Sequence, residues 1–250
     1  IRDPNGVVSA GIAVFADITE RRRAEEAERH ERADRDLLGR VATAAIATQD
    51  LMSFQQELLA LVGGALDVSR TYIFTYRHDR RTMDNTAEWT APGVAPQRDH
   101  LQGLPADPEW WWIATLMRNE EIRFADIEDI PDERTRADLR AQDIRSILVV
   151  PLFIGARYCG FMGFDECRRH RAWTPRERDL LAEGARILMG VWADADLRQS
   201  EMRFQGMLRN VSTVAVQGYA MDGTVRYWNR ASEALYGYTA EEAHGRNLLD

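Results

Sequence analysis

Few residues in this chain of 250 amino acids have the types and spacing that catalysis requires. The two cysteines, Cys159 and Cys167, do not form a CxxC pair, and we interpret them as reduced thiols. None of the five histidines forms an HxxxH or HExxH pair that would bind a metal ion. All 32 basic residues are arginines, which excludes a P-loop lysine and a Schiff-base lysine. The sequence therefore predicts no catalytic residue and no metal site.

Composition excludes further classes of function. A net charge of −8 argues against a nucleic-acid-binding surface. No run of 18 apolar residues occurs, and the N-terminus has no secretory signal pattern. We therefore expect a cytoplasmic region without nucleic-acid or membrane contacts, although a membrane anchor elsewhere in a longer chain stays open.

A long helical region is expected from residue 20 to about residue 70, with a break near Thr48–Asp50. Its apolar residues recur at alternating steps of four and three, which is the heptad pattern of a coiled coil. The pattern predicts a homodimer through parallel helices, with this seam: Leu37, Val41, Ala44, Leu51 and Leu58. The alternative is an amphipathic helix that packs on its own domain.

The central region carries strand and helix signals in an α+β order. Strands are expected at residues 71–76, 82–90, 122–125, 146–154 and 157–164, the last two as a hairpin around Gly155-Ala156. Helices are expected from Asp107-Pro108, from Pro131-Asp132 and from the capping box Thr174–Glu177 to beyond Leu208.

Both ends of the sequence look like parts of other domains. The residue types of Asp3–Gly6 favour a tight turn, and a short strand follows them. After it a charged helix is expected, with Thr19 as its N-cap. Near the other end, a hairpin around Asp222-Gly223 precedes two helix starts, capped by Asn229 and Thr239. We therefore expect this sequence to be a window from a longer chain.

These pieces resemble known families once they are set in order. The middle resembles a GAF domain of bacterial sensor proteins, through the motifs SRTYIFTY, NTAEWT, IRSILVVPLFIGARYCGFMGFDE and RAWTPRERDLLA. The opening RDPNGVVSAGIAVFADITERRRAEE resembles the C-terminal end of a PAS domain. The closing DGTVRYWNRASEALYGYTAEEAHG resembles the N-terminal half of another. The expected domains are residues 1–19 (PAS end), 20–50 (signalling helix or coiled coil), 51–197 (GAF), 198–208 (linker helix) and 209–250 (PAS half).

The resemblance implies an α+β fold. A central antiparallel sheet would have helices packed on it, flanked by long signalling helices and partial PAS-like pieces. It also implies a ligand cavity, and these residues fall on its walls in relatives: Trp89, Trp111, Trp112, Ile122, Phe124 and Asp126. Aromatic walls with one or two polar groups suit a small organic ligand. The alternative is that the tryptophans fill a sealed core.

The sequence does not specify the ligand or cofactor. Relatives of the phytochrome kind attach a bilin through a cysteine ahead of the VVPL strand, whereas residues 126–149 contain none. The cyclic-nucleotide signature of other relatives needs a lysine, which this chain lacks. We therefore expect neither of these two ligand modes.

Two functional hypotheses follow from the resemblance, and both describe a non-enzymatic region. One is a sensory module that binds a small ligand; the other is a dimerising relay without a ligand. In the relay, Asp17, Thr19 and Arg21 would couple a strand end to a helix start by a charge-assisted hydrogen bond. The parent protein would be a sensor histidine kinase, or alternatively a diguanylate cyclase or phosphodiesterase.

Overall fold

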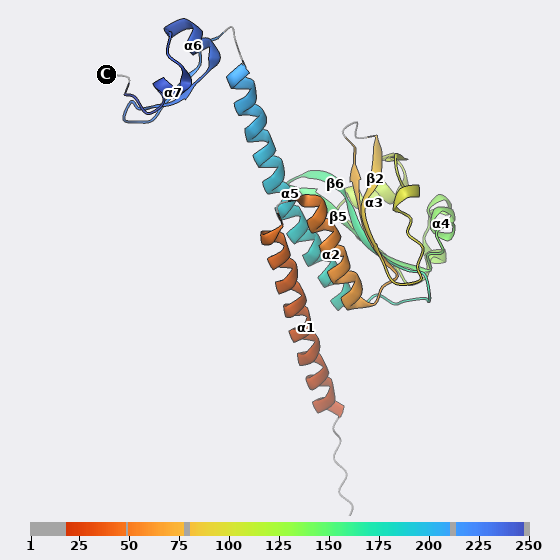
Figure 1. The fold of residues 1–250 in the computed structure, drawn as a ribbon. Helices are drawn as coiled ribbons and strands as arrows, with labels where there is room; N and C mark the ends of the chain where they lie inside the picture. The colour runs from red at the N-terminus through yellow and green to blue at the C-terminus, as the bar shows by residue number, and fades with distance from the viewer. Residues whose placement is uncertain (1–18, 49, 78–80, 211–213, 248–250) are drawn as a thin grey trace, which may run out of the picture. The chain divides into compact units, whose positions relative to one another are not determined.

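The computed structural model describes residues 19–48, 50–77, 81–210 and 214–247. The chain divides into two compact units, residues 1–187 and residues 188–250. The N-terminal hairpin expected before residue 18 lies outside the described residues, and so does Asp17. Figure 1 labels the helices of both units and strands β2, β5 and β6 of the first.

A six-stranded antiparallel sheet forms the centre of the first unit. In spatial order its strands are β3 (Leu104–Pro105), β2 (Thr82–Thr90), β1 (Arg70–Tyr76), β6 (Arg157–Glu166), β5 (Ser146–Ile154) and β4 (Ile122–Phe124). The hairpin predicted around Gly155-Ala156 is confirmed, because Ile154 pairs with Arg157 at its tip. The unit is therefore an α+β fold, as the sequence predicts.

Two helices joined by a short turn precede the sheet. Helix α1 spans Thr19–Ala47 and helix α2 spans Leu51–Leu66. The Asp50 side chain caps α2 by accepting a hydrogen bond from the Ser53 N–H at 2.9 Å. The chain reverses at this cap, so that the two helices run in opposite directions (Figure 1). The predicted break near Thr48–Asp50 is confirmed.

The helix layer covers one face of the sheet. Helix α5 (Pro175–Asn210) begins in the first unit at the predicted capping box, where Thr174 and Glu177 exchange hydrogen bonds. A Cβ atom placed on Gly184 would stand 3.4 Å from Leu58 of α2 and 3.8 Å from Met162 of β6. Helices α2 and α5 therefore lie directly on the sheet.

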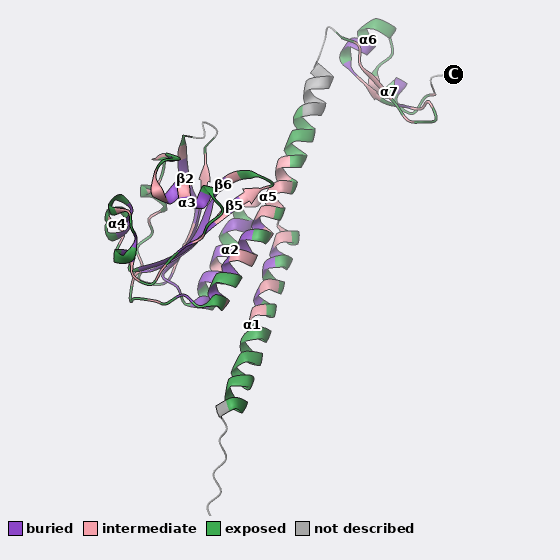
Figure 2. Ribbon diagram, turned by 180° about the vertical axis from the view of Figure 1, so that it is seen from behind, coloured by how far each residue is buried: buried purple, intermediate pink, exposed green. Residues whose placement is uncertain are grey.

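Four of the five residues of the predicted dimer seam are buried inside the chain. Leu37 and Ala44 of α1 are each 5% exposed, and Val41 of α1 and Leu58 of α2 are fully buried. Because α1 folds back against α2, these four residues pack within one chain, while Leu51 is half-buried. The homodimer predicted through this seam stays a prediction. Residues 20–33 are exposed on all sides of α1, as Figure 2 shows in green.

The other face of the sheet is covered by shorter elements. Helices α3 (Trp111–Met117) and α4 (Glu133–Arg140) lie there with two 3₁₀ turns, η1 (Arg98–His100) and η2 (Ile127–Asp129). The expected helix start at Asp107-Pro108 is wrong. Asp107 forms a turn instead, accepting the Glu109 N–H on its side chain at 2.9 Å, and α3 begins at Trp111.

The second unit contains a hairpin followed by two short helices. Strands β7 (Gln217–Tyr219) and β8 (Val225–Trp228) pair antiparallel, and helices α6 (Arg230–Tyr236) and α7 (Ala240–Ala243) follow. The predicted caps are confirmed: Asn229 accepts the Ser232 N–H, and Thr239 forms a capping box with Glu242. The resemblance of this unit to a PAS domain stays a prediction.

No helix in the described parts of the chain combines the length and apolar character needed to cross a membrane.

Candidate ligand-binding site

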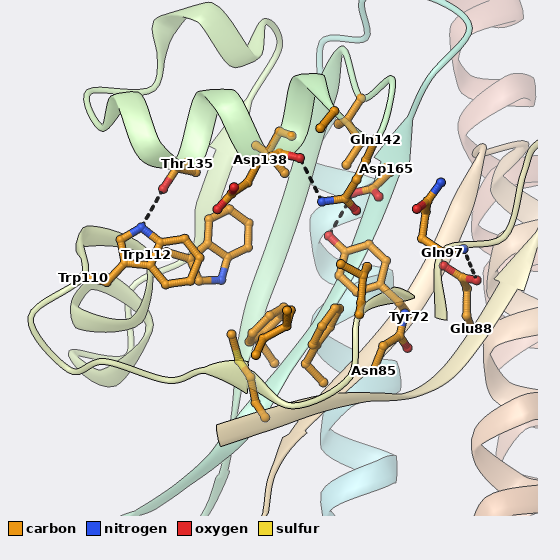
Figure 3. A pocket seen from close by; sticks show the side chains of 18 residues that line it. Tyr72, Asn85, Glu88, Gln97, Trp110, Trp112, Thr135, Asp138, Gln142 and Asp165 are labelled. Atoms are coloured by element: carbon orange, nitrogen blue, oxygen red, sulfur yellow. Dashed lines mark hydrogen bonds between the residues drawn. The ribbon is translucent and has the colours of Figure 1, made fainter. Parts of the chain in front are cut away.

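A cavity of about 340 Å³ lies between the sheet and the elements that cover its second face (Figure 3). Strands β1, β2 and β6 form its floor, and α4, the start of α3 and residues 97–104 form its walls. The lining residues are Tyr72, Phe74, Met83, Asn85, Glu88, Gln97, Leu101, Leu104, Trp110, Trp112, Thr135, Asp138, Leu139, Ala141, Gln142, Ile144, Phe161 and Asp165. The volume is near the lower end of the range for small-molecule sites, about 300–1,000 Å³.

Aromatic rings form the floor of the cavity. Phe74 and Phe161 stack with ring centroids 4.7 Å apart and planes inclined by 14°. Trp112 meets Phe161 edge to face, with a centroid distance of 5.6 Å. The strand period of two places these rings on one face, because Phe74 lies opposite Phe161 in the β1–β6 ladder. The floor is therefore apolar and aromatic.

A buried ion pair borders the floor. Arg70 Nε lies 3.3 Å from Asp165 Oδ2, and both residues are 2% exposed. The Tyr72 hydroxyl donates to Asp165 Oδ1 at 2.9 Å. Burial raises the pKa of Asp165, while Arg70 and Tyr72 oppose it, and the pKa is about 6. Asp165 therefore gains or loses its proton at a pH closer to neutral than an ordinary aspartate does.

Tyr72 reaches Asp165 because β6 has a glycine beneath its ring. Gly163 lies opposite Tyr72 in the ladder, and a Cβ atom there would stand 2.5 Å from the Tyr72 hydroxyl oxygen. Any larger residue at this position would push the ring away from the sheet. The glycine thus positions the phenol for its hydrogen bond to Asp165.

The wall opposite the floor is held by a tryptophan and the start of α4. The Asp132 side chain caps α4 and also accepts from Trp110 Nε1 at 3.1 Å. Thr135 Oγ1 lies at the same distance from Trp110 Nε1, and the Arg134 guanidinium stands 4.4 Å from the ring centroid. Trp110 is therefore fixed between α3 and α4.

Asn85 is the least satisfied polar side chain of the cavity. It is 2% exposed, and neither its side-chain nitrogen nor its oxygen has a hydrogen-bond partner among the described residues. An unpaired buried polar atom costs about 1–3 kcal/mol. This cost calls for an explanation, because buried polar groups are nearly always paired.

Of the six predicted ligand-binding residues, one lines the cavity and five do not. Trp112 forms part of the wall. Trp111 packs on Phe124 with ring centroids 6.2 Å apart, and Ile122 is 1% exposed in the core. Asp126 caps η2 by accepting the Glu128 N–H at 3.0 Å. The ligand-binding role predicted for these residues is untested. The packing of Trp111 on Phe124 agrees with the alternative, in which the tryptophans are part of the core.

Trp89 lies on the opposite face of the sheet, so its placement on the cavity wall is wrong. The β1–β2 register shifts by one residue, so that Ile73 pairs with Ala87 while Phe74 pairs with Asn85. This bulge reverses the alternation, which puts Glu88 on the cavity side. A Cβ atom on Gly63 of α2 would stand 2.3 Å from the Trp89 ring, which places that ring against the helix layer.

Tyr72, Asn85 and Asp165 are functional candidates that the sequence did not single out. The Tyr72–Asp165 contact joins residues 93 positions apart, which periodicity does not reveal. Glu88 was missed because the bulge in β2 exchanges its face with that of Trp89. Its side chain accepts the Gln97 and Arg98 N–H groups at 2.8 and 3.0 Å. The signal that could have found Tyr72 is Gly163, a glycine inside an apolar strand, which marks a close approach.

Behind the cavity floor, a polar cluster connects the sheet with the helix layer. Glu166 accepts from Ser69 Oγ at 2.7 Å and from Arg168 Nε at 3.1 Å, and Arg171 Nη1 lies 3.4 Å away. Arg171 Nε also donates to Glu177 Oε1 in the first turn of α5 at 2.9 Å. Burial would raise the pKa of Glu166, but the hydrogen bonds from Arg168 and Ser69 outweigh it and lower the pKa to about 2.

The remaining chemical groups do not gather at the cavity. No group of three or more metal-binding side chains occurs among the residues that the structure describes. Cys159 is buried and Cys167 is half-buried, and burial raises the pKa of Cys167 to about 11. Of the predicted relay residues, Thr19 is the first residue of α1, and Arg21 pairs with Glu25 at 2.8 Å on the exposed helix surface.

Comparison with known proteins assigns the fold. The GAF domain family model matches residues 50–190, more than half of the chain. The methanogenesis regulatory histidine kinase FilI of Methanothrix harundinacea (strain 6Ac) is 31% identical over 221 residues. That alignment covers 84% of this chain and 24% of the kinase, so the chain spans about a quarter of that relative's length.

Two solved structures share the architecture. The phycocyanobilin-bound GAF domain from a cyanobacterial phytochrome gives a TM-score of 0.58 at 18% identity, covering 66% of this chain and 96% of that one. The GAF domain of a phosphoenolpyruvate-protein phosphotransferase from Coxiella burnetii gives 0.57 at 16% identity, covering 67% and 96%. At these identities the likeness concerns the fold. Together with the family match, it shows that this chain belongs to the GAF domain family.

Proposed function

We propose that this chain is the sensory and signal-relay region of a signal-transduction protein. A small ligand occupies the cavity, and its binding changes the packing of the helix layer. The observation that carries the proposal is the adjacency of Asp165 and Glu166 on β6. Asp165 borders the cavity floor, and Glu166 belongs to the polar cluster behind it. A change at the floor therefore has a short covalent path to the helix layer.

The polar cluster continues to α1. Arg176, in the first turn of α5 next to Glu177, donates from Nε to both carboxylate oxygens of Asp34 at 3.0 and 2.8 Å. Because both side chains are partly buried, this pair is screened less than a surface ion pair. The contacts support a relay from the cavity floor through the start of α5 to the middle of α1.

The output of the parent protein is proposed from the relative. The similarity to a histidine kinase over most of this chain supports a sensor kinase as the parent. The relay through Asp17, Thr19 and Arg21 stays part of the proposal, with α1 leading away from the cluster toward those residues.

Pairing of two chains through the helix layer is also proposed, with contact residues that differ from the predicted seam. Leu37, Val41 and Ala44 are covered by their own chain. The exposed large apolar side chains of the α1–α2 turn are Ile46, 87% exposed, and Met52, 57% exposed. These two would lie in the contact.

The test compares two substitutions by tryptophan, one within α4 and one at its C-cap. Ala141, the C-cap residue, lines the cavity and is exposed at its edge, whereas Ala137 of α4 is exposed and does not line the cavity. Native mass spectrometry of the purified chain should show small-molecule adducts that Ala141→Trp removes and the matched control Ala137→Trp retains. An adduct unaffected by Ala141→Trp would place the ligand elsewhere. A chain without any adduct, which also binds nothing in a thermal-shift screen of metabolites, would favour the relay without a ligand.

A further inference from the structure

Asn85 is held at the cavity by its backbone, while its side chain has no role in the fold. The Asn85 N–H donates to the Leu101 carbonyl at 2.9 Å, and its own carbonyl accepts from Gln102 Nε2 at 2.9 Å. Both side-chain polar atoms are unpartnered among the described residues. A leucine of similar size would fill the same space without unpaired polar atoms, so stability does not explain the amide.

The side chain lies on the cavity side of the sheet. Asn85 is opposite Phe74 across the β1–β2 ladder, and Figure 3 shows it beside Tyr72 among the lining side chains. The terminal torsion of an asparagine is broad, so rotation of the amide is inexpensive. Such a rotation turns the covered nitrogen and oxygen toward the cavity. A bound molecule there would meet one donor and one acceptor side by side.

The charges around the cavity select against anions. Three carboxylates line it, those of Glu88, Asp138 and Asp165, and the lining residues include no arginine or histidine. The nearest buried cation, Arg70, is committed to Asp165 and to the carbonyls of Ala95 and Gln142, at 3.3 and 2.8 Å. An anionic ligand would enter without a cation to balance it, which is unfavourable in a buried site.

We propose that the ligand is a flat molecule of one or two rings, neutral or cationic, with adjacent hydrogen-bond donor and acceptor groups that pair with the Asn85 amide. A primary carboxamide and a lactam both have this arrangement. The rings pack against Phe74 and Phe161, and the size follows from the cavity of about 340 Å³. This inference rests on the proposed function, because it names the ligand class for the same cavity.

The experiment uses three probes that share one ring. Benzamide has the donor and the acceptor, acetophenone has the acceptor alone, and benzoate carries a negative charge. NMR titration of the purified chain should give a dissociation constant for benzamide at least tenfold lower than for the other two. Tenfold corresponds to about 1.4 kcal/mol. Equal affinity for benzamide and benzoate would overturn the charge argument, and equal affinity for benzamide and acetophenone would overturn the paired hydrogen bonds.

Variants at Asn85 separate ligand recognition from folding. Asn85→Leu should weaken the binding of benzamide at least tenfold and change the affinity for acetophenone by no more than about twofold. It should keep or raise the midpoint of thermal unfolding, because it removes two unpaired polar atoms. Asn85→Asp should shift the preference toward benzamidine, a cation of the same shape. A lowered unfolding midpoint in Asn85→Leu with unchanged benzamide affinity would show that the amide supports the fold and would overturn the proposal.

Failure of this inference is distinguishable from failure of the proposed function. An adduct that Ala141→Trp removes, but that is an anion or lacks a carboxamide-like edge, leaves the sensory function standing and overturns the assignment of the ligand class. If neither an adduct nor any of the probes binds, both proposals fail together.

Discussion

Two neighbouring carboxylates show how differently the two faces of the sheet are built. Asp165 points to the cavity, and Glu166, the next residue of β6, points to the helix layer. Both are buried, yet the pKa of Asp165 is raised to about 6 and that of Glu166 is lowered to about 2. Burial raises the pKa in both cases, so the number and charge of the hydrogen-bond donors decide the outcome.

The carboxylate on the helix face, Glu166, has more hydrogen-bond donors around it than Asp165 on the cavity face. Glu166 accepts from a hydroxyl, a backbone N–H and an arginine, and a second arginine, Arg171, stands beside it. Asp165 has one arginine and one phenol, and the lining beside it includes Asn85 with unpaired atoms. The helix face is therefore fixed by its own residues, whereas the cavity face has polar groups that a ligand could complete.

The largest effect is expected at Glu166. Glu166→Gln removes the charge that Arg171 and Arg168 surround, and breaking a buried charged cluster typically costs about 3–5 kcal/mol. Because Arg168 is partly exposed, we expect the lower end of this range. Glu166→Gln should lower the free energy of unfolding, measured in urea, by about 3 kcal/mol.

The matched control for Glu166→Gln is Glu133→Gln. Glu133 is 66% exposed and also pairs with two arginines, so its loss should cost about 0–1 kcal/mol. Similar costs at the two positions would mean that the cluster behind the cavity is no more firmly held than a surface pair.

The next effect tests which face Trp89 occupies. Gly63 and Gly64 are neighbours on α2, but a Cβ atom on Gly63 would collide with the Trp89 ring, whereas Gly64 has no neighbour within 4 Å. Gly63→Ala should therefore destabilise the fold by about 2 kcal/mol through overpacking. Gly64→Ala should stabilise it by about 0.5–1 kcal/mol, since alanine favours a helix. Thermal and urea unfolding measure both, and stabilisation by both variants would return Trp89 to the cavity side.

Local chemistry made much of the fold predictable. A helix cap depends on residues three apart, so the starts at Thr174, Asn229 and Thr239 could be found from the sequence. The hairpin around Gly155-Ala156 depends on a short turn between two apolar strands, which is also a local signal. Five of the six strands follow from such signals together with the family resemblance, whereas β3 (Leu104–Pro105) lies in a stretch without a strand signal.

The cavity was less predictable because it depends on register and on contacts between distant residues. One bulged residue in β2 exchanges the faces of Glu88 and Trp89, and no local pattern marks it. The heptad pattern of α1 identified buried residues correctly, but burial inside a chain and burial in a dimer have the same periodicity. No sequence pattern marks Asn85, because an unpaired amide is recognised only when the residues around it are known.

The smallest effect distinguishes the two carboxylates by pH. Asp165 has a raised pKa, so the folded state binds its proton more tightly than the unfolded state, and stability gains as pH falls from about 6 toward 4. Glu166 has a lowered pKa, so its contribution is present above pH 4.5 and is lost as pH falls toward 2.

Between pH 7 and pH 5 only Asp165 of this pair titrates, and its linkage should add about 1 kcal/mol of stability. Asp165→Asn, which retains an acceptor for Tyr72 and Arg70, should abolish that gain in urea unfolding at the two pH values. Comparing the change between pH values, rather than stability at one pH, cancels the cost of altering the contact with Arg70. An identical gain in both proteins would mean that Arg70 and Tyr72 outweigh burial and Glu88 at the cavity floor. The two faces of β6 would then hold their carboxylates in the same charge state.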